Sequence, residues 1–456
     1  MKIKVFLAVS ACKLSIKLLR LLGRGGTAIP GKIAIRICPE LLHYLSKDVS
    51  CIIVTGTNGK TTSSRIIEEI FVKSGKSYFA NRSGANLING ITSIFIENSS
   101  LTGKPKKQNA VIECDEAASK EVCRLINPSI VLVTNVFRDQ LDRYGEVSGT
   151  LQNLLIGIKN SPNATVCLNA DCSLTASIAE QIPNKVIYYG VDVPIYKNPV
   201  EEVSDAPHCI KCKHEYEYSY RTFGHLGGFY CPDCGYKRPK TQVSVTEILS
   251  SGISSTKVRV RVFGDDEVLT INLPGGYNIY NAVGALAVSE AVGFDRSDAK
   301  NAISSFSCGF GRMEQFDLGG HSARIILVKN PAGCNQVINY LTSLSEKTVF
   351  VCCLNDNSAD GKDVSWIWDV NFEKLAEMDE LIPEIYVSGI RSGDMAVRLK
   401  YAGIDEKKLQ VFADYDDLIS QMSSQPLPVI IMPTYTAMMD LRAKMSAEFG
   451  GKDFWE

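Results

Sequence analysis

IVTGTNGKTTSS, residues 53–64, contains two glycines, a lysine and six hydroxyl side chains within twelve residues. It continues an apolar run that begins at Cys51, and the apolar residues after it recur at helical spacing until Gly75. The stretch therefore joins a strand to the start of a helix. At such a junction, backbone N–H groups and the helix dipole converge on an anion. The sequence predicts a phosphate-binding loop, and the alternative is an ordinary glycine turn before a helix.

The residue types in this loop suit a nucleotide with its magnesium ion. Gly56 and Gly59 allow backbone conformations and a close approach that a Cβ would block. Lys60 can reach the β and γ phosphates, and the Thr61 hydroxyl can hold magnesium. Val54 stands where the standard phosphate-loop spacing requires glycine, so the loop is a variant of that motif. The expected nucleotide contacts are Gly56, Thr57, Asn58, Gly59, Lys60, Thr61 and Thr62.

The rest of the chain reads as α/β, with short β-branched runs alternating with helical patterns. We expect an N-terminal helical segment in residues 1–45 and a central ATP-binding domain in residues 46–315. The central domain should contain a largely parallel sheet. Residues 205–240 interrupt it as a small insert, rich in Cys, His, Tyr and Gly, with no buried-strand signal. A second alternating series predicts a Rossmann-like domain in residues 316–456.

The composition of the chain limits the classes of partner and the compartment that we expect for it. The 456 residues carry a formal net charge of −1, so no overall basic field indicates nucleic acid or an anionic membrane surface. Most of the 15 cysteines sit singly in apolar runs, which is typical of buried thiols in a reducing cytoplasm. The basic, apolar start of the chain predicts an amphipathic helix rather than a cleaved signal, and such a helix can contact another domain or the membrane surface.

The insert contains two C-x2-C pairs, CIKC at 209–212 and CPDC at 231–234. Two thiolate pairs at this spacing can close a tetrahedral zinc site, whereas four unconnected core cysteines would have strand-like neighbours. Four protein ligands leave no position for water, so we expect a structural site. Nearby histidines are unnecessary as ligands and should lie at the surface or behind the ligands; they are His208, His214 and His225. The expected zinc ligands are Cys209, Cys212, Cys231 and Cys234.

The loop and further stretches in the same order resemble the Mur ligase and folylpolyglutamate synthase superfamily. These stretches are VIECDE, VTNVFRDQLDRYGE, LPGGYNIYNAVGALA and GRMEQF. The resemblance implies ATP as substrate, with Glu113 joining Thr61 at magnesium. It also implies an adenine site at Asn281 with Asn278 beside it, and contact of Arg312 with nucleotide phosphates. Gln140 stands where amino-acid-adding members usually have a metal-binding histidine, and no carbamylated lysine is evident.

The C-terminal segments VKNPAGCNQ and CLNDNSADGKDVSWIWD resemble the ligase subunits of lipid II isoglutaminyl synthases, which share the four-cysteine insert. That resemblance implies ATP-dependent amidation of the D-glutamate α-carboxylate of the lipid II stem peptide through an acyl phosphate. The chain has no G-x-C-x-G nucleophile elbow, so the glutaminase that supplies ammonia should lie elsewhere. The resemblance implies that it is a separate GatD-type subunit. By the same resemblance, Asp356 would orient the partner's catalytic histidine, with Asp360 as the second candidate.

Two other functions stay open on the sequence alone. A Mur or folate ligase would join an amino acid to its acceptor without a partner. A zinc-ribbon protein would bind nucleic acid, although the mixed local charge and the lack of a long basic stripe argue against it. The expected location is the cytoplasm, at the inner face of the membrane if the first helix contacts lipid.

Overall fold

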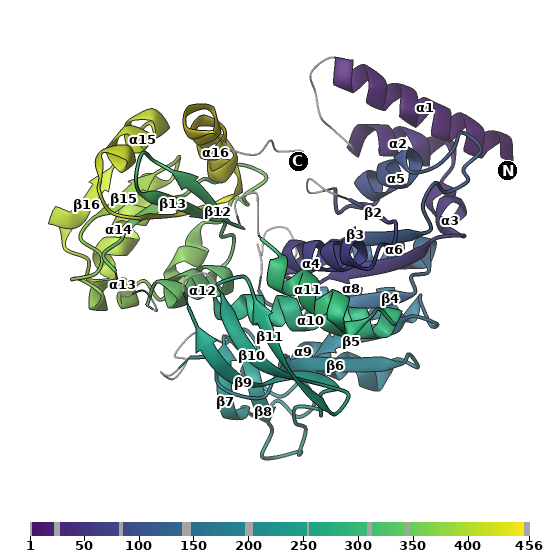
Figure 1. Cartoon of the computed structure of the whole chain (residues 1–456), viewed down its shortest axis with the longest axis horizontal. Helices are drawn as coiled ribbons and strands as arrows, with labels where there is room; N and C mark the ends of the chain where they lie inside the picture. The colour runs from purple at the N-terminus through teal and green to yellow at the C-terminus, as the bar shows by residue number, and fades with distance from the viewer. Residues whose placement is uncertain are drawn as a thin grey trace.

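The computed structural model describes residues 2–21, 28–81, 85–138, 147–196, 204–252, 255–307, 312–342, 344 and 346–450. Figure 1 shows three parts: helices at one edge, a large sheet in the middle and a smaller sheet in a separate lobe. Chain order places the edge helices first and the smaller sheet last. The predicted α/β class is confirmed.

The central sheet has nine strands in the order β11-β10-β9-β6-β5-β4-β1-β3-β2. Pairing is parallel from β2 to β9 and antiparallel among β9, β10 and β11. The strands are β1 (Ser50–Thr55), β2 (Phe79–Ala80), β3 (Asn109–Glu113), β4 (Ile130–Val133), β5 (Thr165–Asn169), β6 (Val186–Val191), β9 (Val243–Ser251), β10 (Thr256–Val262) and β11 (Asp265–Ile271). Strands β1 and β3 to β6 were predicted from their apolar runs.

Alternate residues of the central strands enter two different cores, because successive side chains of a strand point to opposite faces. Ile52 and Val54 of β1 pack with one set of helices, and Cys51 and Ile53 pack with the other. The first set is α4 (Lys60–Lys73), α10 (Gly276–Val292) and α11 (Arg296–Ser305). The second set includes α3 (Leu41–Ser46), α5 (Ile88–Glu97), α6 (Glu116–Ile126) and α8 (Val147–Lys159).

Two further helices precede α3, and the short segments α9 (Ser173–Ala176) and η1 (Ser177–Gln181) follow β5. Helices α1 (Lys2–Leu21) and α2 (Ala28–Ile37) pack against α5, and α1 places Val5, Val9 and Cys12 in the second core. The predicted N-terminal helix is therefore present. Within the described ranges, none of the helices is long and apolar enough to cross a membrane.

The insert contains a β-hairpin that the sequence analysis missed, formed by β7 (Glu217–Phe223) and β8 (Leu226–Tyr230). The expectation of no buried strand was wrong, because Phe223 and Leu226 enter the core beside α10. Tyrosines and glycines dominate these strands, so they lack the β-branched alternation that predicts a strand. The insert is therefore packed onto the central domain rather than held by its cysteines alone.

The second sheet has six strands in the order β12-β13-β17-β14-β15-β16 and is parallel except for β12. Its strands are β12 (Arg312–Asp317), β13 (Ser322–Ile326), β14 (Val349–Cys353), β15 (Ile385–Ser388), β16 (Leu409–Val411) and β17 (Val429–Pro433). Helices α12 (Pro331–Leu341), α13 (Glu373–Glu377) and α14 (Ser392–Tyr401) with η2 (Ser365–Asp369) share one core; α15 (Tyr415–Ser424) and α16 (Tyr435–Phe449) share the other. The short η3 (Glu406–Lys408) leads into β16. Residues 312–315, assigned above to the central domain, belong to this sheet through β12.

Candidate nucleotide and metal sites

The predicted phosphate loop lies between β1 and α4, as residues 56–59. Gly59 precedes α4 with φ +85°, and Gly56 has φ +116°. Residues with a side chain rarely adopt these backbone conformations. A Cβ on Gly56 would lie 2.4 Å from Thr134 Oγ1, and one on Gly59 would lie 2.2 Å from Asn281 Oδ1. Both glycines are therefore required by backbone conformation and by space.

Lys60 is buried at the start of α4 and already has an anionic partner. Its Nζ lies 3.2 Å from both carboxylate oxygens of Glu116 and donates to the Gly56 carbonyl at 2.5 Å. The side chains of Lys60 and Glu116 are 10% and 7% exposed. An incoming phosphate would therefore compete with Glu116 for this ammonium group. The sequence analysis missed Glu116, although it ends the quoted VIECDE stretch at the start of α6.

Thr61 and Glu113 come together as predicted. Thr61 Oγ1 donates to Glu113 Oε2 at 2.8 Å. Asn81 fixes the end of β3, since its side chain accepts from the Glu113 N–H at 2.8 Å and donates to the Glu113 carbonyl at 2.7 Å. A hydroxyl and a carboxylate oxygen are ligands that magnesium prefers, so this pair fits a magnesium ion beside the loop.

Asn135 holds the phosphate loop in shape and is a second residue that the sequence analysis did not single out. Its amide accepts from Asn58 N–H at 2.9 Å and donates to the Asn58 carbonyl at 3.1 Å. The Thr57 hydroxyl accepts from Phe137 N–H at 3.0 Å, so this side chain anchors the loop to the segment after β4. The signal was the Thr-Asn pair of VTNVFRDQLDRYGE, quoted only as part of the resemblance.

The amides predicted to contact adenine lie directly beside the phosphate loop. Asn281 Oδ1 accepts from the Ser63 hydroxyl at 3.4 Å, and Asn281 Nδ2 donates to Asn278 Oδ1 at 3.0 Å. Helix α10 thus brings both asparagines to α4 across more than 200 residues of chain. Their adenine contact stays a prediction. Two other predictions, the side chain of Arg312 and residue Gln140, lie outside the described residues.

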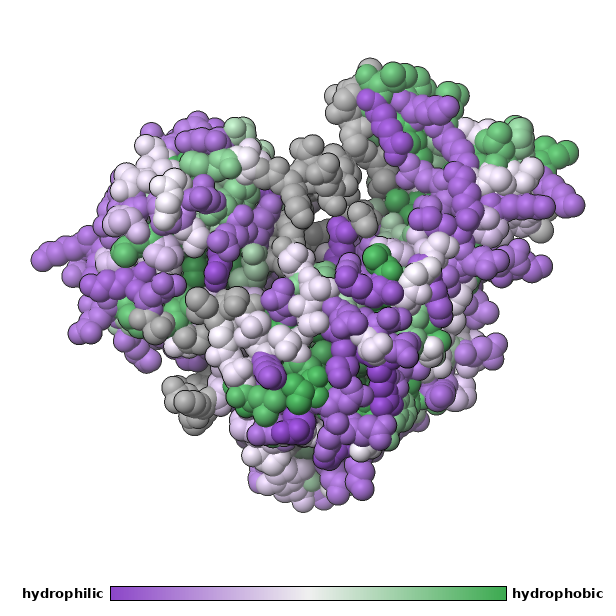
Figure 2. Space-filling view, in the orientation of Figure 1, coloured by the Kyte–Doolittle hydropathy of each residue, from purple (hydrophilic) through white to green (hydrophobic). Residues whose placement is uncertain are grey.

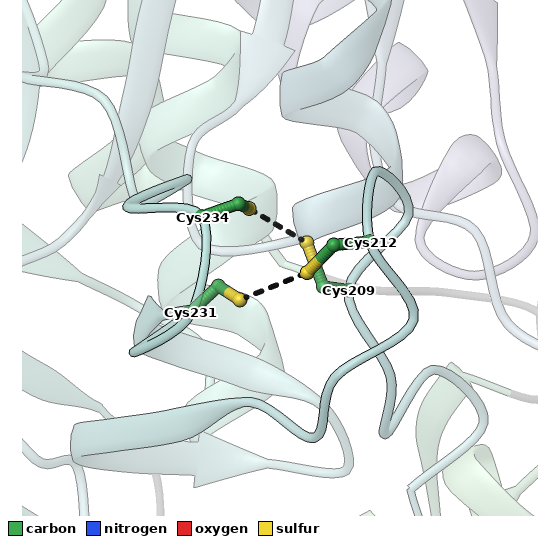
Figure 3. Close-up of side chains that lie close together, drawn as sticks. All are labelled: Cys209, Cys212, Cys231 and Cys234. Carbon is green, nitrogen blue, oxygen red and sulfur yellow. Dashed lines mark hydrogen bonds between the residues drawn. The ribbon is translucent and has the colours of Figure 1, made fainter.

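The four predicted cysteines form one cluster, with all sulfur atoms within 4.8 Å of one another. Figure 3 shows the two C-x2-C loops facing each other, with Cys209 Sγ 3.6 Å from Cys234 Sγ and Cys212 Sγ 3.4 Å from Cys231 Sγ. Each loop closes on a left-handed residue: Lys213 at φ +68° and Gly235 at φ +74°. Tetrahedral zinc with bonds of about 2.3 Å requires sulfur separations of this size, so the cluster fits zinc.

The histidines of the insert divide into two classes. His208 and His214 are exposed, as expected. His225 is fully buried, so its placement at the surface or behind the metal ligands was wrong. Its ring lies 3.3 Å from Cys172 Sγ and packs on Phe137, whose backbone bonds Thr57 of the phosphate loop. Burial, aided by nearby Arg221, lowers the pKa of His225 to about 3.

A buried network connects the insert to α10. Asp171 is fully buried and accepts from Arg238 Nε at 2.7 Å and from the Tyr280 hydroxyl at 2.5 Å. Burial raises the pKa of Asp171, and Arg238 opposes that rise. Thr222 of β7 bonds the same Tyr280 hydroxyl at 2.8 Å. Thr222, between the two cysteine pairs, and Arg238, after the second pair, therefore connect the insert through Tyr280 and Asp171 to the helix that carries Asn278 and Asn281.

The two candidate aspartates of the C-terminal lobe have different surroundings. Asp360 is buried, and its two oxygens accept from the backbone N–H and the hydroxyl of Thr436 at 2.7 and 2.5 Å. Asp356 follows β14, and its carboxylate lies 3.8 Å from Arg391 Nη1 with 23% of the side chain exposed. Asp360 is thus engaged within its own lobe, whereas Asp356 can be reached from outside.

The phosphate loop lies at the junction of the two lobes. Asn330, which caps α12, donates to Asn58 Oδ1 at 3.1 Å. Arg138 Nη2 contacts Asp369 Oδ2 at 2.5 Å, and Arg138 N–H also donates to Asp205 at the start of the insert. These contacts place groups from both sheets around one loop.

Comparisons with known proteins identify the family. The families described as Mur ligase middle domain and MurT ligase C-terminal match residues 54–225 and 327–438. The MurT subunit of a glutamine-hydrolysing lipid II isoglutaminyl synthase from Streptococcus pneumoniae is 35% identical over 98% of both chains. The corresponding subunit from Staphylococcus aureus strain COL is 31% identical over 97% of this chain and 98% of its own.

The solved structure of a pseudomurein peptide ligase type C from Methanothermus fervidus shares the fold, with a TM-score of 0.66 and 20% identity over 90% of this chain and 81% of that one. The order of the motifs, the geometry of the loop and the whole-length similarity agree. The chain belongs to the MurT family, the Mur ligase-type subunits of glutamine-hydrolysing lipid II isoglutaminyl synthases.

Proposed function

We propose that this chain activates the α-carboxylate of D-glutamate in the lipid II stem peptide with ATP, so that ammonia can convert it to D-isoglutamine. The carboxylate oxygen attacks the γ phosphorus, the bond to the β-phosphate oxygen breaks, and ADP leaves. Ammonia then attacks the acyl carbon, inorganic phosphate leaves with the bridging oxygen, and a proton is lost from nitrogen. The products are a carboxamide, ADP and phosphate.

The residues of the loop suit the first step because charge must be neutralised on the transferring phosphoryl group. The 56–62 backbone would bind the phosphates at the start of α4, and Lys60 would exchange Glu116 for phosphate oxygens. Thr61 and Glu113 would hold magnesium, which would supply further positive charge there. Arg312 would contact the phosphates, and Asn278 and Asn281 would bind adenine. The lobe junction would exclude water from the acyl phosphate.

Ammonia would come from a GatD-type glutaminase subunit in a heterodimer. Asp356 is the candidate for orienting that partner's catalytic histidine, as the third member of a triad would. Its exposure and the engagement of Asp360 by Thr436 support this choice. Cys209, Cys212, Cys231 and Cys234 would hold a structural zinc ion. We place the chain in the cytoplasm, and its lipid-linked substrate would bring it to the inner face of the membrane.

The observation that carries this proposal is the loop geometry, with Lys60 and the Thr61–Glu113 pair converging at the start of α4. The test combines the chain with the glutaminase, ATP, magnesium, lipid II and glutamine labelled with nitrogen-15 in its amide. We expect the label in the stem peptide, and none with Lys60→Ala of unchanged thermal stability and circular dichroism. Labelled product from that variant at the wild-type rate would contradict the ATP site.

The same reaction separates the proposal from its rival. A Mur or folate ligase would join a free amino acid to the acceptor when the purified chain is supplied with ATP alone. We expect no such product. If it forms without the glutaminase, the function of the chain is amino-acid addition rather than amidation.

A further inference from the structure

Helix α1 has apolar residues on two opposite faces, and only one of these faces is covered. The inward face packs Val5, Ala8, Val9, Cys12 and Ile16 into the core shared with α5. The outward face carries five large aliphatic side chains that are 51% to 82% exposed, at a spacing of three, four or seven residues. They are Ile3, Leu7, Leu14, Leu18 and Leu21.

Such spacing places these five side chains along one stripe of a helix about 30 Å long. Phe6 borders the stripe, and Ile29 at the start of α2 is also exposed. Figure 2 shows hydrophobic surface at both ends of α1 on the outer edge of the molecule, with hydrophilic side chains between them. Exposed apolar side chains aligned on one helix face in this way mark an interaction site.

The charged residues of the segment that contains α1 and α2 are all basic. Eight basic residues precede Glu40, the first acidic residue in the chain, although the whole chain has a net charge of −1. The basic residues are Lys2, Lys4, Lys13, Lys17, Arg20, Arg24, Lys32 and Arg36. Lys13 and Arg20 contact the adjacent Ser99 carbonyl and Glu97, whereas Lys2, Lys4 and Lys17 are exposed beside the stripe.

We propose that the outward face of α1 binds flat on the surface of an anionic lipid bilayer. Apolar side chains would enter the boundary between headgroups and acyl chains, and the exposed lysines would lie among the anionic headgroups. This chemistry favours lipid over a second copy of the chain, because two stripes facing each other would also bring two basic segments together. The proposal draws on the proposed function only for the lipid-linked substrate that would make such binding useful.

The position of α1 suits this contact. The helix lies at the outer edge of the molecule, with α2 and α5 between it and the central sheet (Figure 1). Bilayer contact along its outward face would leave the phosphate loop and the C-terminal lobe on the water side. Binding through one such helix is reversible, which agrees with an enzyme that must move between substrate molecules.

The test is co-sedimentation of the full-length chain with vesicles of phosphatidylglycerol and phosphatidylcholine, or of phosphatidylcholine alone, all free of lipid II. We expect binding to the anionic vesicles that weakens with salt. Leu14→Gln with Leu18→Gln should lower the partition coefficient by roughly tenfold or more, since two aliphatic side chains leave the bilayer. Lys2→Gln, Lys4→Gln and Lys17→Gln together should lower it by a similar factor on anionic vesicles alone.

The matched control is Val397→Gln with Tyr401→Gln, because these residues are also exposed and four apart on a helix, α14. This variant should bind vesicles like the wild type. Absence of binding by the wild type, or equal binding by all variants, would overturn the proposal. A third outcome would also overturn it: the wild type does not bind vesicles, and the α1 variants lose self-association or glutaminase binding. The stripe would then contact a protein rather than lipid.

A parallel assay uses a water-soluble stem-peptide substrate. Every α1 variant should keep wild-type amidation of it. Failure of the wild type in this assay would count against the proposed function, while the vesicle result would still decide the membrane proposal.

Discussion

The choice between Asp356 and Asp360 depends on what each carboxylate already binds. Asp360 accepts two hydrogen bonds from Thr436, and its loss should leave a half-buried N–H and hydroxyl without this acceptor. Asp356 has a long contact to Arg391 and an accessible carboxylate. The two residues therefore predict different defects when they are changed.

We expect Asp356→Asn to lower glutamine-driven amidation and to leave ammonia-driven amidation at the wild-type rate, because only the partner's glutaminase step would need this carboxylate. Asp360→Ala should instead lower the free energy of unfolding by about 1–3 kcal/mol. Steady-state rates with each nitrogen source, together with urea unfolding, measure both. Equal losses with glutamine and ammonia for Asp356→Asn would remove it from the partner's active site.

His225 predicts a loss of stability in mild acid. Its pKa is about 3 in the folded chain, below the value of about 6.5 in an unfolded chain. Between these values the unfolded chain binds a proton that the folded chain excludes. The stability contribution is therefore present above about pH 6.5 and falls as the pH drops, by about 2 kcal/mol at about pH 5.

Urea unfolding at about pH 7.5 and about pH 5 measures this loss. His225→Gln should be less stable at both values but should lose about 2 kcal/mol less between them. Carboxylates and cysteines titrate in both proteins, so their contributions cancel in the comparison. As a control, His208→Gln at an exposed position should show the same fall in the free energy of unfolding between the two pH values as the wild type. An unchanged loss in His225→Gln would show that this ring does not control the acid response.

The positions of residues in short motifs could be predicted from the sequence. The two loop glycines, the Thr61–Glu113 pair and the four cysteines lie as expected. Glu116 and Asn135 could not be separated from ordinary helix-start and loop residues, because their role comes from contacts with a loop more than 50 residues away. The burial of His225 depends in the same way on the packing of the hairpin against Phe137.

At the scale of elements, the insert also supports helix α10 of the central domain. In the hairpin, Phe223 packs into the core beside α10 and Thr222 hydrogen-bonds to Tyr280. Arg238 forms an ion pair with the buried Asp171. These contacts converge on α10, which lies against the phosphate loop at Gly59 and Asn281. Packing therefore links the insert that carries the cysteine cluster to the helix beside the phosphate loop.

Removal of the proposed zinc ion should lower both stability and nucleotide affinity. A chelator should lower the thermal midpoint and weaken ATP binding measured by calorimetry, because α10 loses part of its support. Arg238→Ala should have a similar effect with zinc retained, since it leaves Asp171 buried without its cation, at a cost of about 3–5 kcal/mol. Unchanged ATP affinity in folded, zinc-free protein would show that the two sites are independent.

Strands with continuous apolar runs were predicted, whereas strands with alternating or weak patterns, such as β10 (TKVRVRV), were not. Runs such as 51–54 and 349–353 are buried on both faces, which is typical of parallel strands covered by helices. Strands β7 and β8 are rich in tyrosine and glycine, and β12 carries the Gly-Arg-x-Glu resemblance that pointed to the nucleotide instead. Their pairing depends on the partner strand more than on their own composition.

At the scale of the whole molecule, two α/β lobes meet at one loop. Asn58 of the loop contacts Asn330 of the second lobe, and Arg138 beside the loop pairs with Asp369. The groups proposed to bind phosphate thus lie at the same junction as the lobe that carries Asp356. This arrangement suits a reaction in which an acyl phosphate forms at one lobe and meets ammonia delivered beside the other.

The most direct test follows the oxygen atoms of the substrate carboxylate. Lipid II whose D-glutamate α-carboxylate is labelled with oxygen-18 is incubated with the chain, the glutaminase, ATP, magnesium and glutamine, and the released phosphate is analysed by mass spectrometry. If the carboxylate attacks the γ phosphorus held at the start of α4, each phosphate released carries one labelled oxygen and the carboxamide keeps the other. Unlabelled phosphate alongside amidated product would contradict an acyl phosphate and with it the function assigned to the loop.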